Sequence, residues 1–380
     1  MLMNYLSTTS SGSATRSLLL RSQRCHYYLL QRDLNLAYYY HHSSSKHFST
    51  SRSFSNTSPM FLDNVQRISA FSHNNKGGNP AGVLILSDDM PSDQTMMSIA
   101  KDVGYSETAF LKKRSNSDNN NDWNIRYFAP EMEVPFCGHA TIASGSALGQ
   151  HYGLGMYQLY LSSGANVSIE VSSTTASGDD ADNKDLVYTT TLQSPGTWSK
   201  DADKELIDSV FDTFGNNLTA SEHADTDRFP IRLAHGGSTH LIIAFKDKVT
   251  LSEMSYDFDK LKTIMEENDL VTVNLVWLDD DSAKKDEVLF HSRNLFPPGG
   301  VYEDPATGSA AAALGGYLRD IGFDNARLSS SSVGTKATNC KFEILQGFDM
   351  GVPSRLIVEF NDKNVGEGIY VTGETRQIAT

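Results

Sequence analysis

The chain has 380 residues, 39% of them hydrophobic, and is therefore long enough for two domains with buried cores. Its 32 basic and 46 acidic side chains give a formal net charge of −14, which argues against nucleic acid and anionic membranes as partners. The sequence has no apolar run close to the roughly 18 residues that span a bilayer, and its three cysteines match neither a disulfide framework nor a zinc motif, so we expect a reducing compartment.

The first 54 residues differ in composition from the rest of the chain. They contain six Arg or Lys residues against one acid, Asp33, and many serines, which is typical of an organellar transit peptide. Arg52 stands two residues before Phe54, as at mitochondrial processing sites. We therefore assign residues 1–57 to a transit peptide and expect a mitochondrial protein. A disordered extension on a cytoplasmic or plastid protein is the alternative.

The first half of the remaining chain predicts strands and one amphipathic helix. The helix is expected over 91–104, because Ser92 can cap its start, apolar residues recur on one face and Gly104 can end it. Polar tracts over 114–122 and 173–184 predict surface loops. Strands are expected over 65–73, 81–87, 106–113, 123–130, 165–171 and 185–192.

The second half repeats this alternation. Residues 229–245 form a strand, glycine turn, strand pattern like that of residues 65–87, and helices are expected over 201–215 and 256–269. Further strands are expected over 272–278, 286–296, 341–346, 354–360 and 367–378. The chain is thus predicted to be a mixed protein of helices and strands in which strands dominate.

Two segments indicate an internal repeat. Residues 128–150 and 295–317 each contain a strand, a Pro-rich turn and a helix of small residues. At a spacing of 166 residues, Ala140 and Thr141 align with Ala306 and Thr307. We interpret the repeat as a gene duplication into two similar domains.

The small residues of the two helices have a packing explanation. A helix with full side chains is about 10–12 Å wide, and Ala, Gly and Ser make it narrower, so that a curved sheet can wrap around it. We predict an α+β fold of two duplicated domains, each a strongly curved mixed sheet or half-barrel around a central Ala/Gly-rich helix. The domains would cover 58–195 with 365–380, and 196–364. A helix pair packed through Ala faces is the alternative.

Both predicted central helices begin with polar or small residues. The first turn of a helix presents unpaired N–H groups and the positive end of the helix dipole, which bind anions. If the duplication places the two starts face to face, they form a clamp for a substrate carboxylate. Asp304 and Thr307 could instead simply cap the second helix. The residues at the two starts are Gly138, His139, Ala140 and Thr141, and Asp304, Pro305, Ala306, Thr307, Gly308 and Ser309.

Three titratable residues could act on a bound carboxylic acid. Glu107 begins a β-rich apolar stretch, where burial would raise its pKa and suit it to general acid/base catalysis. His139 lies at the first helix start and Asp304 just before the second. Taken alone, each of the three could equally be structural.

Five ordered motifs resemble those of the PhzF (phenazine biosynthesis-like) family. They are "GGNPAGVLIL", "YSETAFL", "FCGHATIAS", "EDPATGSAAAAL" and "LQGFDMGVPS", and the resemblance covers residues 61–378. It implies a diaminopimelate epimerase-like fold, no cofactor, no metal and a homodimer. It also implies that Glu107 is the acid/base residue and that His139, Asp304 and Ser309 line the site. We expect substrate contacts from Asn79, Gly138, Ala140, Thr141, Thr307 and Gly308.

Two positions depart from the patterns of related proteins. Cys137 stands where the epimerases have one catalytic thiol, but the region near Pro305 has no cysteine, which disfavours a two-thiol mechanism. Cys137 is therefore interpreted as a small buried residue. After "DMG" the family usually has Arg, whereas this chain has Val352.

The family's founding activity isomerises a dihydro-hydroxyanthranilic acid by proton shifts. We therefore expect an isomerase that moves a proton on a small amino- or hydroxy-substituted carboxylic acid, with Glu107 as the base. A non-catalytic metabolite-binding or scaffold protein on the same fold is the alternative. No phosphate-binding loop is present, and His235 and His240 lack companions at metal-ligand spacing.

Overall fold

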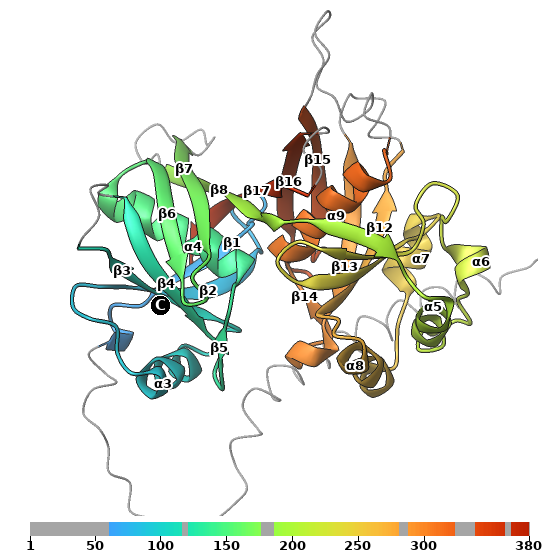
Figure 1. The fold of residues 1–380 in the computed structure, drawn as a ribbon, viewed down its shortest axis with the longest axis horizontal. Coiled ribbons are helices and arrows are strands. Elements are labelled where there is room, and N and C mark those ends of the chain that lie inside the picture. Colours follow the sequence, from blue (N-terminus) through green and yellow to red (C-terminus); the bar gives the residue numbers. More distant parts are fainter. Residues whose placement is uncertain are drawn as a thin grey trace, which may run out of the picture. The chain divides into compact units, whose positions relative to one another are not determined.

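The structure, a computed structural model, describes residues 61–115, 121–175, 186–280, 288–323, 339–361 and 366–379 (Figure 1). All of these belong to the unit formed by residues 56–380. The predicted transit peptide, residues 1–57, lies outside the described residues, as do parts of the two predicted polar loops. The fold is a mixed sheet that forms a barrel, with few helices.

The strands of the first half form a closed ring. Each strand is hydrogen-bonded to the next in the order β1, β2, β3, β4, β6, β7, β8, β17, and β17 pairs with β1. The pairs β2–β3 and β4–β6 are parallel and the others antiparallel. The elements are β1 (Gln66–Ala70), β2 (Asn79–Leu86), α3 (Asp93–Val103), β3 (Thr108–Lys113), β4 (Asp122–Phe128), β5 (Glu133–Val134), α4 (Gly138–Tyr152), β6 (Gly155–Leu161), β7 (Asn166–Thr175), β8 (Leu186–Gly196) and β17 (Gly368–Gln377).

The second half repeats these pairings. Its order is β9, β10, β11, β12, β13, β15, β16, β17, with β11–β12 and β13–β15 parallel. The elements are β9 (Trp198–Asp201), α5 (Lys204–Phe211), α6 (Ala220–His223), β10 (Arg232–His235), β11 (Thr239–Ala244), α7 (Lys248–Glu253), α8 (Phe258–Glu267), β12 (Thr272–Leu278), β13 (Leu289–Leu295), η2 (Pro297–Gly299), β14 (Glu303–Asp304), α9 (Gly308–Asp320), β15 (Asn339–Gln346) and β16 (Ser354–Asn361).

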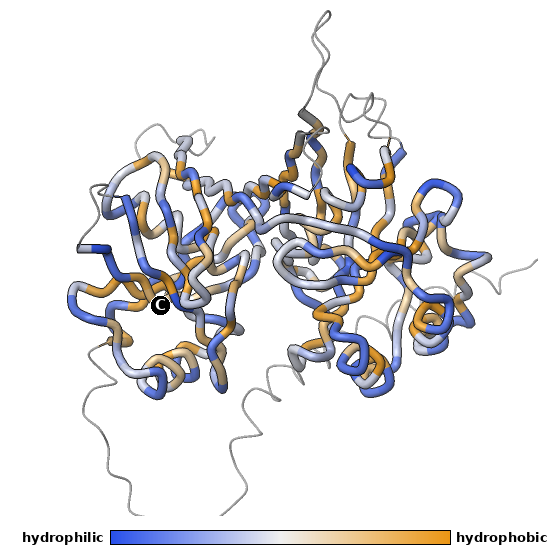
Figure 2. The backbone as a smooth tube through the Cα atoms, viewed as in Figure 1, coloured by the Kyte–Doolittle hydropathy of each residue, from blue (hydrophilic) through white to orange (hydrophobic). Residues whose placement is uncertain are grey.

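The two halves are joined by strands that serve both. The last strand, β17, pairs with β16 of the second half and with β8 and β1 of the first. The chain also passes from β8 of the first half directly into β9, which pairs with β10 of the second half. Buried and exposed positions alternate along β7 and β17, and Figure 2 shows the corresponding mixture of apolar and polar residues along the strands.

Helices α4 and α9 are almost completely buried against strands. α4 packs against β1, β2, β7 and β8, and α9 against β9, β10, β16 and β17. A Cβ atom on Gly145 would lie 2.4 Å from the Thr190 side chain, and one on Gly316 would lie 2.6 Å from Thr197. The strands therefore approach closer than a larger helical side chain permits. Within the described residues, no helix is both long and apolar enough to cross a membrane.

The structure corrects the register of the internal repeat. The two helices begin at Gly138 and Gly308, and the preceding short strands at Glu133 and Glu303, so the spacing is 170 rather than 166. The difference of four residues is about one helical turn. An Ala-rich sequence matches itself after one turn, and the sequence comparison therefore selected the wrong turn.

Each half has an Arg–Glu ion pair between equivalent strands. Arg126 on β4 contacts Glu133 at 2.5 Å, and Arg293 on β13 contacts Glu303 on β14. The first pair is about one-quarter exposed, whereas the side chains of the second are 3% and 5% exposed. Arg293 also donates to the backbone carbonyl of Leu251 at 2.9 Å. The second pair therefore fixes the start of the segment that leads into α9.

We predict that Glu303→Gln destabilises the protein by about 3 kcal/mol, because it removes the buried carboxylate that is hydrogen-bonded to the Arg293 guanidinium. Glu133→Gln is the matched control and should cost about 1 kcal/mol or less, since that pair is more exposed. Urea unfolding of both variants measures the difference. Equal losses would contradict the account of the buried pair.

Candidate functional site

The N-termini of α4 and α9 meet backbone to backbone. A Cβ atom on Gly138 would lie 3.3 Å from the Cα atom of Gly308, and one on Gly308 would lie 3.5 Å from the Cα atom of Gly138. The structure thus brings together the two helix starts that the sequence identified. Their first N–H groups and the positive ends of two helix dipoles lie at one place.

Neither of these two starts is capped by a side chain. The N-cap residues Cys137 and Thr307 make no side-chain cap hydrogen bond. By contrast, Ser92 and Asp247 accept a backbone N–H at the starts of α3 and α7. The alternative role of Thr307 as a side-chain cap is therefore not observed. Uncapped starts leave N–H groups for another acceptor.

Glu107, His139 and Cys137 form a contiguous group beside the start of α4. Glu107 directly precedes β3, and its carboxylate oxygen lies 3.3 Å from Nε2 of His139. The Cys137 sulfur lies 3.4 Å from Nδ1 and 3.8 Å from Nε2 of the same ring. Ser106 Oγ is 3.5 Å from Nε2. His139 is buried, and the Glu107 side chain is 15% exposed, so this carboxylate is the member of the group open to a ligand.

Asp304 is held at the start of α9 by hydrogen bonds. Asn79 donates to its Oδ1 at 2.8 Å and to the Ala306 carbonyl at 3.0 Å, and the Thr307 hydroxyl donates to its Oδ2. Burial raises the pKa of Asp304 to about 6, against the lowering effect of His139 and these donors; the Glu107 charge raises it further. Asp304 therefore interacts electrostatically with both Glu107 and His139, across the junction of the two halves.

Cys137 is a protonated thiol at neutral pH. Burial raises its pKa well above the usual value, and the Glu107 and Asp304 carboxylates raise it further. Because the thiolate is the nucleophile, this environment fits the interpretation of Cys137 as a buried residue. Its equivalent at the start of α9 is Thr307.

The two predicted threonines use their hydroxyls inside the protein. Thr141 donates to the Cys137 carbonyl at 2.7 Å and lies 2.7 Å from the Tyr127 hydroxyl. The Thr307 hydroxyl contacts Asp304 and receives a hydrogen bond from Asn294. These side chains orient the helix starts rather than reaching toward a ligand. Ala140 and Gly308 are buried at the same starts, and the partly exposed Ser309 is the second residue of α9, as His139 is of α4.

Sequence reasoning missed one polar side chain that organises the second helix start. Gln346 at the end of β15 donates to the Asp304 carbonyl at 2.7 Å and accepts from the Thr307 N–H at 3.3 Å. The sequence feature that could have identified Gln346 is its position as a polar residue at the end of the predicted strand over 341–346, within "LQGFDMG". Phe71 was missed as well; it is fully buried, and its ring lies 3.3 Å from where a Gly308 Cβ would be.

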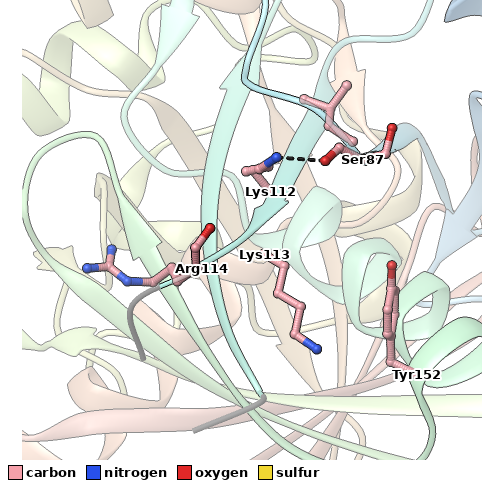
Figure 3. A pocket seen from close by; sticks show the side chains of 7 residues that line it. Ser87, Lys112, Lys113, Arg114 and Tyr152 are labelled. Atoms are coloured by element: carbon pink, nitrogen blue, oxygen red, sulfur yellow. Dashed lines mark hydrogen bonds between the residues drawn. The ribbon is translucent and has the colours of Figure 1, made fainter. Parts of the chain in front are cut away.

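A surface cavity of about 430 Å³ lies at a different place (Figure 3). Two of its cationic side chains already interact with other residues of the chain. Lys112 donates a hydrogen bond to the Ser87 carbonyl at 2.7 Å, and the Arg114 guanidinium lies over the Tyr160 ring. None of the predicted site residues lines it. The lining residues are Leu86, Ser87, Lys112, Lys113, Arg114, Ser115 and Tyr152.

Residues 68–379 match the family model described as "Phenazine biosynthesis-like protein", and the chain belongs to this family, the PhzF family. The predicted family is therefore confirmed. The relatives that follow are named isomerases, and the chain is accordingly an isomerase by class.

The chain is 28% identical over 316 residues to the uncharacterized isomerase YfhB of Bacillus subtilis, covering 81% of this chain and 94% of the relative. It is 28% identical over 302 residues to trans-2,3-dihydro-3-hydroxyanthranilate isomerase of Pseudomonas fluorescens, covering 78% and 90%. Among solved structures, a PhzF-family protein of Bacillus anthracis matches with a TM-score of 0.63 and 20% identity, covering 83% of this chain and 96% of that one. The structural likeness supports the fold.

We predict that Gly138→Ala weakens binding of a small carboxylic acid about tenfold, because the added methyl forces the two helix starts apart. Gly316→Ala is the control; its methyl would lie 2.6 Å from Thr197, closer than the 3.3 Å contact at Gly138, but on the body of α9. It should lower stability without changing affinity. Calorimetric titration with hydroxyanthranilate and thermal unfolding measure both quantities, and equal affinity loss in the two variants would contradict the prediction.

We predict that Asp304→Asn alters the pH dependence of stability. The folded-state pKa of about 6 lies above the ordinary value of 3.8, so the folded protein holds this proton more tightly than the unfolded chain. Wild-type stability should therefore fall, relative to the variant, as the pH rises from about 4 to about 6, by at most about 3 kcal/mol. Urea unfolding across this range measures the difference, and a pH-independent difference would refute the raised pKa.

Proposed function

We propose that this isomerase shifts a proton on a small amino- or hydroxy-substituted carboxylic acid without a cofactor. The observation that carries the proposal is the position of the Glu107–His139 pair beside two uncapped helix starts in backbone contact. The substrate carboxylate accepts hydrogen bonds from the N–H groups of these starts. The Glu107 carboxylate removes a proton from carbon and returns it to another carbon of the same molecule.

Removal of such a proton is difficult because negative charge accumulates on the substrate carboxylate. Preorganised N–H donors and helix dipoles stabilise this charge without reorganisation. They are most effective where water is excluded, and Gly138 and Gly308 are both buried. The paired helix starts thus provide the stabilisation that proton abstraction by a carboxylate requires.

The neighbouring residues have complementary proposed roles. His139 contacts the Glu107 carboxylate and holds it at the site, and it can exchange protons with it. Asp304, with its pKa of about 6, can donate or accept a hydrogen bond at an amino or hydroxyl substituent, oriented by Asn79. Ser309 is the polar side chain at the second helix start. The N–H groups of Gly138, Ala140 and Gly308 hold the carboxylate, with Thr141 and Thr307 supporting them.

The relative from Pseudomonas fluorescens is named for its action on trans-2,3-dihydro-3-hydroxyanthranilate. We propose a substrate of the same general class, a cyclic acid with amino or hydroxyl substituents. Two anchoring elements on opposite halves suit such a molecule, because one can hold its carboxylate while Asp304 holds a substituent on the ring.

We further propose that the two halves arose by duplication, each a curved sheet around a central helix. The repeated strand pairings and the equivalent starts of α4 and α9 support this. The proposed domains are residues 58–195 with 365–380, and 196–364. A homodimer and a mitochondrial location also remain proposals, supported by the family and by the composition of the first 54 residues.

We predict that Glu107→Gln abolishes incorporation of solvent deuterium into the substrate while ligand binding persists, because the amide cannot accept the proton. Full-length protein in D₂O is incubated with a mixture of cyclic amino and hydroxy carboxylic acids, and mass spectrometry detects carbon-bound deuterium. Glu133→Gln is the matched control, since Glu133 pairs with Arg126 on β4, and it should label normally.

Undiminished exchange in Glu107→Gln would remove Glu107 from the mechanism. The alternative, a non-catalytic metabolite-binding protein, predicts that the wild type binds an acid but labels none. Calorimetric titration of the same mixture components separates that result from a simple absence of ligand.

A further inference from the structure

The Thr307 hydroxyl at the start of α9 lies at the centre of a chain of hydrogen bonds. It accepts from two side-chain amides, Nδ2 of Asn294 and Nε2 of Gln346, the latter at 3.1 Å. A hydroxyl group has two lone pairs and one hydrogen. Because the amides occupy both lone pairs, the hydrogen is left for the third neighbour, Oδ2 of Asp304. The two amides therefore hold Thr307 as a donor to this carboxyl group.

The other contacts of the two amides agree with this orientation. Gln346 Oε1 accepts from the Thr307 N–H at 3.3 Å, and Gln346 Nε2 also donates to the Asp304 carbonyl at 2.7 Å. Asn294 is 0% exposed, and its Oδ1 atom has no hydrogen-bond partner among the described residues. A reversed Asn294 amide would put its NH₂ group, with two donors, in the place of this unpaired oxygen, which is less favourable. The hydrogen bond to Thr307 thus gives the buried Asn294 amide a role.

The internal repeat shows that a helix start of this kind does not require the chain of hydrogen bonds. Its four members have equivalents in the first half, identified by strand register and by the helix starts. None of these equivalents is an amide or a carboxylic acid, although α4 begins without a side-chain cap just as α9 does. The chain of hydrogen bonds therefore serves Asp304 rather than the formation of a helix start. The equivalent pairs are Asn294 and Tyr127, Asp304 and Val134, Thr307 and Cys137, and Gln346 and Leu161.

Both oxygens of the Asp304 carboxyl group accept a hydrogen bond within the protein. Asn79 donates to Oδ1 at 2.8 Å, and Thr307 donates to Oδ2. These donors stabilise the ionised form of the carboxyl group. A protonated Asp304 cannot donate to Thr307 in return, because the lone pairs of that hydroxyl are occupied.

The titratable groups that face Asp304 belong to the first half. Burial has the largest effect on Asp304 and raises its pKa to about 6; His139 lowers this pKa and Glu107 raises it. The Cys137 thiol is neutral, because burial raises its own pKa. Above about pH 6, Asp304 is therefore an ionised acceptor, and any substituent that it binds has to be a hydrogen-bond donor.

We propose that Asn294 and Gln346 are positioning residues of this isomerase, which act through Thr307 to hold Asp304 as the acceptor for a hydrogen-bond donor on the substrate. The substrate class is thereby narrowed to acids with an amino or hydroxyl group at this place, and a keto group there is excluded. Substrate recognition rests on the proposed function, because Asp304 meets the substrate only if the acid binds at the two helix starts. The chain of hydrogen bonds does not depend on it.

The role of Asn294 is tested first without a ligand, by ¹³C NMR titration of the Asp304 carboxyl group in the full chain, with the signal assigned by its loss in Asp304→Asn. Asn294→Leu frees a lone pair of Thr307 to accept from protonated Asp304, so the titration midpoint should rise by about one pH unit. Ser292→Ala is the matched control on β13. Ser292 donates to Asn274 Oδ1 at 2.8 Å, and its loss should leave the midpoint unchanged.

A double variant tests whether the effect passes through Thr307. Thr307→Val should also raise the midpoint, and Asn294→Leu should add no further rise in that background. An unchanged midpoint in Asn294→Leu would overturn the proposal, as would an undiminished rise in the double variant. Circular dichroism verifies folding, and Asn294→Ala, with the same expected rise, takes the place of the leucine variant if that variant does not fold.

Substrate recognition is tested by calorimetric titration with hydroxyanthranilate and with unsubstituted benzoate at neutral pH. Both acids have a carboxylate, but only the first has donor substituents. The preference for hydroxyanthranilate should fall about tenfold in Asn294→Leu and persist in Ser292→Ala. An unchanged preference, or an equal loss of affinity for both acids, would overturn the recognition. If the wild type binds neither acid, the proposed function fails for this substrate class, whereas the NMR titration still decides the role of Asn294.

Discussion

The backbone contact between Gly138 and Gly308 is the constraint on which the rest of the structure depends. A Cβ atom on Gly138 would lie 3.3 Å from the Gly308 Cα atom, which is tighter than most real Cβ contacts, so the absence of a side chain at Gly138 eases this close approach. The contact places two sets of N–H groups at one point and leaves both helix starts without a side-chain cap. Each helix is also closely packed along its length, by Thr190 of β8 against Gly145 in α4 and by Thr197, between β8 and β9, against Gly316 in α9. The small residues of α4 and α9 thus have two effects: they make each helix narrow, and they allow the two helix starts to lie close together.

The chemistry of the site comes from the differences between two similar halves. The two halves have similar strand pairings, and each has an Arg–Glu pair before its buried helix, α4 or α9. At equivalent positions, however, α4 has His139 where α9 has Ser309, and β5 has Val134 where β14 has Asp304. The first half therefore supplies the imidazole and the Glu107 carboxylate, which is the proposed base, whereas the second supplies the carboxyl whose pKa is raised by burial. These different groups on the two halves suit the proposed substrate, which has a carboxylate at one end and an amino or hydroxyl substituent elsewhere.

Much of the fold could be predicted from local sequence patterns. The helix over 93–103 has the expected cap at Ser92 and ends at Gly104, because capping depends on neighbouring residues only. Closure of the ring of strands in the first half and the pairing of β17 with strands of both halves depend on contacts between distant strands, which no local pattern encodes. Glu107 could be found because a carboxylate in an apolar stretch is unusual. The contribution of Gln346 could not, since its two contacts involve backbone groups about 40 residues away.

A crystal structure of the wild-type protein with hydroxyanthranilate tests the central claim most directly. The account predicts that the carboxylate of this acid lies against the N–H groups at the starts of α4 and α9, with its ring within reach of the Glu107 carboxylate. A ligand bound in another place, or a carboxylate turned away from both helix starts while the site is accessible in the crystal, would contradict the account.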